Sequence, residues 1–129
     1  MAIRYPVIAV LLALLCANAY ALALSDATVH SHLGEPLAVS LAVSDSQPLV
    51  AQQVRVRFGT PEEYASAGMD RNDMPRDATL TVEQAGKELR VLISTENSVA
   101  QPFIDFLLVV ESPQARLERH YTLLLDLPR

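Results

Sequence analysis

The stretch LAVSLAVS, residues 37–44, alternates a large apolar side chain with Ala or Ser at every position. Successive side chains of a β-strand point to opposite faces, so a period of two is typical of a strand with one face on a core. The same alternation recurs on both sides of this stretch. We predict strands at 29–33, 37–44, 54–58, 78–84, 89–94, 103–111 and 117–125.

One segment departs from this period and predicts a short helix at about 61–67. Thr60 can cap the first turn, Pro61 suits the first helical position, and Glu63 completes a capping box. Gly68 can adopt the left-handed conformation that ends a helix. So short a helix is marginal alone, so we expect Tyr64 to hold it on a sheet.

About seven short strands at regular spacing, with one helical connection, predict an all-β, immunoglobulin-like β-sandwich. The length of 129 residues suits one domain, and a hydrophobic fraction of 50% excludes intrinsic disorder. The 15 acidic residues outnumber the 10 basic ones and give a net charge of −5. Nucleic acid is therefore not an expected partner.

The first 21 residues have the features of a secretory signal peptide. Arg4 gives a positive start, residues 7–16 form an unbroken apolar run, and Ala19-Tyr20-Ala21 fits the A-x-A cleavage pattern. Cleavage after Ala23 is the second choice. The apolar run is short for a membrane span, which needs roughly 20 residues.

We therefore expect a cleaved leader at 1–21 and a domain at 22–129 that is exported to the periplasm. An uncleaved membrane anchor is the alternative. After cleavage we expect no stable membrane anchor. Cleavage would also remove Cys16, the single cysteine, which excludes a disulfide scaffold.

Four ordered groups of motifs then point to a known family. They are LGEPL at 33–37; VRVR, TPEEY and AGMDR at 54–57, 60–64 and 67–71; PFIDFL at 102–107; and RHYTLLLD at 119–126. Together they resemble the N-terminal periplasmic domain of the FimV family, which is needed for type IV pilus assembly and twitching motility. His120 stands where that family pattern leads us to expect an acidic residue.

The resemblance implies a periplasmic, non-enzymatic protein-interaction module. We expect its partner to be an envelope or pilus-assembly protein. Full-length family members continue into a peptidoglycan-binding LysM module, a transmembrane helix and cytoplasmic repeats. The chain ends at Arg129, where the resembling domain ends, so we expect those parts to be absent. A stand-alone protein and a truncated copy both fit this expectation.

Three histidines suggest an alternative function, a small periplasmic carrier of copper or zinc. His30 and His32 alternate within the predicted strand 29–33 and would lie on one face. With His120 as a third ligand they could bind Zn²⁺ or Cu²⁺. No Cys or acidic residue stands at ligand spacing beside them, so we expect no metal and no cofactor.

Enzyme motifs are missing from the sequence: it has no G-x-S-x-G, S-x-x-K or H-E-x-x-H pattern. We therefore expect that the protein is not an enzyme. Asp105 is an isolated carboxylate in the otherwise apolar strand 103–111. We expect it at the mouth of that strand, where it accepts loop N–H groups or pairs with Arg55 or Arg57.

The strand 103–111 is apolar on both faces, and we expect the helix 61–67 and the polar loop 69–77 to cover it. Any uncovered part would be a partner surface, and a partner could also add a strand to an exposed sheet edge. The candidate partner-binding residues are Arg55, Arg57, Phe103, Asp105 and Leu107.

Overall fold

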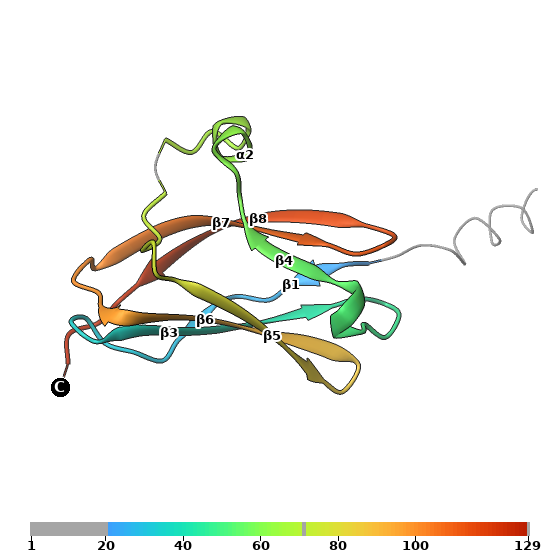
Figure 1. Ribbon diagram of the computed structural model, residues 1–129, viewed down its shortest axis with the longest axis horizontal. Coiled ribbons are helices and arrows are strands. Elements are labelled where there is room, and N and C mark those ends of the chain that lie inside the picture. The colour runs from blue at the N-terminus through green and yellow to red at the C-terminus, as the bar shows by residue number, and fades with distance from the viewer. Residues whose placement is uncertain (1–20, 71, 129) are drawn as a thin grey trace, which may run out of the picture.

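The computed structural model describes residues 21–70 and 72–128, and within them the chain forms two antiparallel sheets packed as a sandwich (Figure 1). The predicted leader therefore lies outside the described residues, apart from Ala21. Among the described residues, no helix is both long enough and apolar enough to cross a membrane.

The larger sheet has the strand order β1-β3-β6-β5, and β2 pairs with β3 beside β1. The smaller sheet has the order β4-β7-β8. The strands are β1 Ala23–Leu24, β2 Thr28–Val29, β3 Pro36–Ser44, β4 Arg55–Phe58, β5 Thr79–Ala85, β6 Glu88–Ser98, β7 Phe103–Glu111 and β8 Arg116–Leu124.

The all-β sandwich and six of the predicted strands are confirmed, but the prediction of a strand at 29–33 is wrong. Only Thr28–Val29 pairs with β3 there. The chain then turns, because the Glu35 carboxylate accepts the His32 N–H at 2.6 Å and Gly34 takes a φ of +88°. The larger sheet gains instead a strand that the sequence analysis did not predict, Ala23–Leu24.

The core lies between the inner faces of the two sheets. In β3 every second residue is buried, from Leu37 to Val43, as the alternation predicted. Phe106 of β7 is fully buried at the centre of the smaller sheet. Its ring meets Phe58 edge-on at 5.9 Å and stacks on Tyr121 at 5.4 Å, so aromatic contacts tie the three strands together.

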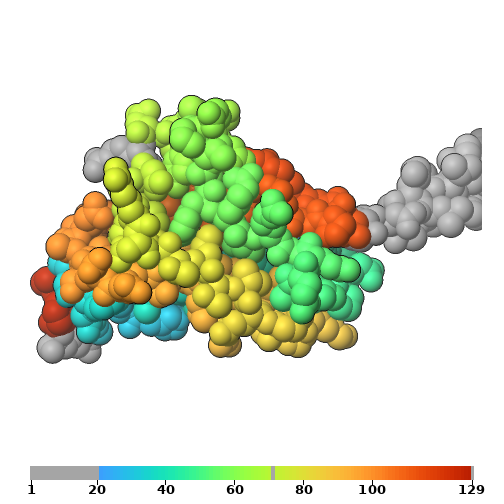
Figure 2. All heavy atoms as spheres, in the orientation of Figure 1, coloured from blue at the N-terminus to red at the C-terminus, as the bar shows by residue number. Residues whose placement is uncertain are grey.

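The short helix α2, Pro61–Ser66, stands over the outer side of the β7–β8 sheet (Figure 1), and its green segment projects from the molecular surface in Figure 2. The predicted capping box is present: the Thr60 hydroxyl accepts the Glu63 N–H at 3.2 Å, and the Glu63 carboxylate accepts the Thr60 N–H at 2.9 Å. Gly68 follows with a φ of +73°. The local sequence thus fixes both ends of the helix. A second short element, the 3-10 helix η1, covers Ala51–Gln53.

Candidate functional site

The outer face of the smaller sheet carries most of the residues that the sequence singled out. The strand register places Arg57 opposite Val109 and Val109 opposite Glu118. The neighbouring row is Arg55, Glu111 and Arg116. Directly opposed residues share a face, so these rows define one outward-facing surface.

A network of charged side chains occupies one half of this face. Arg57 donates to Glu63 at 2.5 and 3.1 Å and to Glu111 at 2.8 Å, and Arg116 donates to Glu63 and, at 2.5 Å, to Glu118. The hydrogen bonds from Arg57 hold the pKa of the Glu63 carboxyl well below its usual range. The hydrogen bonds that Arg57 donates to Glu63 and Glu111 also raise the pKa of Arg57. Arg57 therefore fastens α2 to the sheet.

The helix also covers the middle of β7, as predicted. Tyr64 is buried, and its hydroxyl accepts the Leu107 N–H at 2.9 Å. Leu107 is only 2% exposed, and a Cβ added at Gly59 would meet its Cδ2 at 2.8 Å. Leu107 thus supports α2 from below and lies out of reach of a partner, whereas Arg55 is exposed at the end of β4.

Asp105 lies beyond the helix, and its predicted pairing with Arg55 or Arg57 is wrong. Its carboxylate accepts the Thr122 hydroxyl at 2.5 Å and lies 3.5 Å from His120 Nε2. Both partners stand on β8, which is nearer in the register than β4. The predicted contact with a loop is present in another form, since the Asp105 N–H donates to the Asp73 carboxylate at 3.2 Å.

The far end of the same face is apolar and open. Phe103 is 61% exposed, and its direct neighbour across the ladder, Leu124, is 56% exposed. The sequence analysis included Phe103 but missed Leu124. Continuing the period of two along the predicted strand 117–125 would have placed Leu124 on the outer face beside Phe103.

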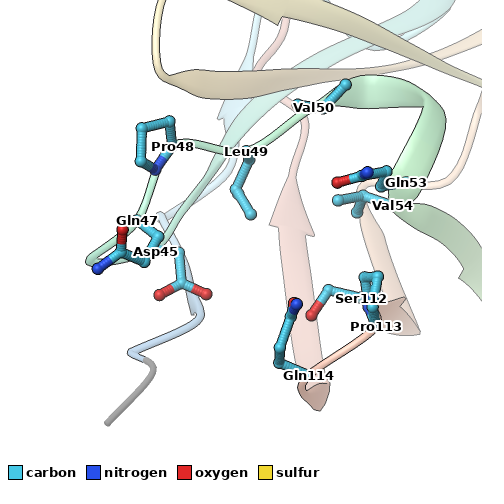
Figure 3. A pocket seen from close by; sticks show the side chains of 10 residues that line it. All are labelled: Asp45, Gln47, Pro48, Leu49, Val50, Gln53, Val54, Ser112, Pro113 and Gln114. Atoms are coloured by element: carbon cyan, nitrogen blue, oxygen red, sulfur yellow. The ribbon is translucent and has the colours of Figure 1, made fainter. Parts of the chain in front are cut away.

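Several hollows open on the surface of the described residues, and three of them adjoin the smaller sheet. One of about 290 Å³ lies between Gly68 and His120, and one of about 380 Å³ adjoins it beneath α2. The third, of about 230 Å³, lies at one end of the sandwich, between the loop after β3 and the β7–β8 hairpin, where Leu49 points inward (Figure 3). The residues that line the third hollow are Asp45, Gln47, Pro48, Leu49, Val50, Gln53, Val54, Ser112, Pro113 and Gln114.

The three histidines have separate partners. His30 Nε2 lies 2.7 Å from the Ser40 hydroxyl, and His32 Nδ1 lies 3.0 Å from the Glu35 carboxylate. His120 faces Asp105. The turn after β2 removes the shared strand face on which the metal hypothesis depended. Within the described residues, no group of three His, Cys, Asp or Glu side chains could hold a metal ion.

Two antiparallel sheets packed as a sandwich, with one short capped helix, define an immunoglobulin-like domain. The model of the FimV N-terminal Ig-like domain matches residues 22–128, so the chain belongs to this family. It is also 33% identical, over 112 residues, to the motility hub protein FimV of two Pseudomonas aeruginosa strains, PAO1 and UCBPP-PA14. The match covers 85% of this chain but only 12% of each relative.

Proposed function

We propose that the protein is a periplasmic, non-enzymatic protein-interaction module connected with type IV pilus assembly or twitching motility. The observation that carries this proposal is the family match over 22–128, together with the identity to a motility hub protein. The match falls in the N-terminal part of a much longer relative. The whole relative's activity is therefore not transferred to this chain.

The surface chemistry supports a binding role. Phe103 and Leu124 expose large apolar area side by side, and burying such area is the main source of affinity between proteins. The charged half of the same face is neutralised internally by Arg57 and Arg116. The apolar half is therefore the part of this face that would gain most from a partner.

A domain exchange tests the proposal. Residues 22–128 would replace the matching domain of the Pseudomonas aeruginosa motility hub protein, and twitching would be measured as the width of the motility zone. We expect the exchange to restore most of the zone, because the fold and the matched positions are shared.

Two controls make the exchange decisive. Deletion of the domain and its replacement by an unrelated immunoglobulin-like domain should both leave twitching impaired. If the chimera accumulates to normal levels and twitching still fails, the proposed function is wrong.

A further inference from the structure

The edge of β8 is a long, open strand edge. Leu125 N–H donates to Pro102 O at 2.9 Å, and Ser112 N–H donates to Ala115 O at 2.8 Å, at the two ends of the β7–β8 ladder. Hydrogen-bonded pairs alternate along an antiparallel ladder. The backbone groups of five β8 residues must therefore point away from β7; they are Arg116, Glu118, His120, Thr122 and Leu124.

Other contacts agree with this assignment. Gly59 N–H donates to Leu107 O, so the backbone groups of Leu107 point toward β4 rather than β8. By the same alternation, the backbone groups of every second residue of β7 point toward β4. At Asp126, the next outward-facing position, the carbonyl accepts the Leu33 N–H at 2.7 Å. Between Arg116 and Leu124, no other described residue makes a backbone hydrogen bond to this edge.

The comparable edge of the larger sheet is covered in part. The Gln84 side chain of β5 donates to Leu49 O at 2.7 Å and accepts the Ala51 N–H at 2.9 Å. The loop before β4 therefore lies along part of the β5 edge. Within the described residues, β8 is the longer edge that the chain leaves without such a cover.

Only one half of the β8 edge is protected by charge. Arg119 points inward and is tied to Leu24 O at 2.7 Å and to Asp26 at 2.6 Å, and Arg116 pairs with Glu118. Charged and inward-pointing ionic residues on an edge strand discourage pairing with another chain. Residues 121–125 read Tyr-Thr-Leu-Leu-Leu and have no such charge.

This unprotected half adjoins the exposed pair Phe103 and Leu124. The exposed Asp126 flanks that pair and adds negative charge to the rim, whereas the Asp105 carboxylate on the other side contacts Thr122 and His120. A partner strand that satisfies the free backbone groups would lay alternate side chains beside Leu124. Apolar side chains there, with a basic residue at the end beside Asp126, would complement both features.

We propose that residues 120–124 of β8, with Phe103, form a strand-addition site for an extended segment of another envelope protein. That segment has apolar side chains at alternate positions and a basic residue at the end that lies beside Asp126. This inference rests on the proposed function, because it names where and how the module would bind its partner.

The test uses a defined probe, the capped peptide Thr-Lys-Thr-Val-Thr-Val-Thr-Lys-Thr, whose Lys and Val side chains share one face of the strand; it is titrated into the purified protein and followed by amide NMR shifts. We expect saturable shifts at Thr122 and Leu124. The same peptide with alternate backbone nitrogens methylated should produce none, because it cannot complete the ladder. A version with Glu in place of both Lys should bind about two- to fivefold more weakly.

Matched variants separate this site from a general apolar effect. Phe103→Ser and Leu124→Ser should each weaken peptide binding about tenfold, because each removes apolar area at the contact. Val50→Ser removes a side chain that is 44% exposed beside η1 and should leave binding unchanged. Shifts confined to β5, or equal binding by all three variants, would overturn the proposal.

Two further outcomes are decisive. If the protein without peptide forms a dimer that Leu124→Ser abolishes, the occupant is a second copy and the proposal is wrong. In the domain exchange, cells whose chimera carries Leu124→Ser should lose twitching motility, whereas cells whose chimera carries Val50→Ser should keep it. Equal motility of these two variants would refute the β8 site and leave the proposed function standing, whereas failure of the unmodified exchange refutes the function itself.

Discussion

Arg55 and Arg57 lie two residues apart on the same face of β4, but Arg57 has a structural role and Arg55 is a surface residue. Both point outward from β4, but Arg57 binds two carboxylates, whereas Arg55 makes no ion pair with the described residues. Arg57→Glu would place a third carboxylate beside Glu63 and Glu111. We expect it to lower the thermal midpoint by at least several degrees, and Arg55→Glu to change it far less, as measured by circular dichroism.

The pH dependence of the difference in thermal midpoint between wild type and Arg57→Glu provides a control. The lowered pKa of Glu63 means that its stabilising contribution is present above about pH 4.3, the unfolded value, and is lost as pH falls through the lower folded value. In Arg57→Glu the repelling carboxylates become neutral in acid. The gap between wild type and variant should narrow below about pH 4, and a gap independent of pH would show that repulsion is not its cause.

At the scale of elements, the helix α2 depends on its two ends more than on its length. Thr60→Ala removes the cap and should cost about 1 kcal/mol. Gly68→Val should cost more, because a branched residue would have to adopt a φ of +73°. A Cβ at Gly68 meets nothing within 4 Å, so the cost is conformational rather than a steric clash. Urea unfolding of both variants measures the two costs.

The variant Gly68→Asn provides the matched comparison, because Asn tolerates the left-handed region better than Val. We expect it to fall between wild type and Gly68→Val. If all three substitutions leave the free energy of unfolding unchanged, the caps do not stabilise this helix.

The elements that could be predicted from the sequence are those that depend on local sequence rules. The helix at 61–67 and the strand at 37–44 depend on local rules, capping and a period of two, and both are present. The strand Ala23–Leu24 was missed because two residues carry no period. The histidine strand at 29–33 was wrong because the bond between His32 and Glu35, three residues apart, favours a turn.

The candidate site was predictable only in part for a related reason. The pattern of its own strand places Phe103 on one face of the sheet, and the structure shows it 61% exposed. The network around Arg57 joins three separate segments through Glu63, Glu111 and Arg116. Strand order and register decide which of many charges meet, and neither is specified by local pattern.

For the whole molecule, the segment after the expected leader connects the two sheets. Through β1 it pairs with β3 of the larger sheet. From the smaller sheet, the Tyr121 hydroxyl donates to Ser25 O at 2.6 Å, and Arg119 donates to Leu24 O at 2.7 Å. Leu24 is buried, and Leu22 packs against the same core. The first residues of the domain therefore hold one side of the sandwich closed.

This arrangement distinguishes the two expected cleavage positions by their effect on stability. Cleavage after Ala21 keeps Leu22 and the pairing of Ala23 with Ser44, whereas cleavage after Ala23 removes both. Leu22 is partly buried, and losing it should cost about 1 kcal/mol, or roughly 4–8 °C in thermal midpoint. We expect a form that begins at Leu22 to melt higher than one that begins at Leu24, by calorimetry on the two purified forms.

Mass spectrometry of the protein recovered from the periplasm then shows which form the cell makes. We expect the mass of a chain that starts at Leu22, because the A-x-A pattern at 19–21 and the stability of the product favour the same position. A start at Leu24 would mean that the cell produces the form with the weaker closure of the sandwich. A full-length chain held in the inner membrane would contradict periplasmic release altogether.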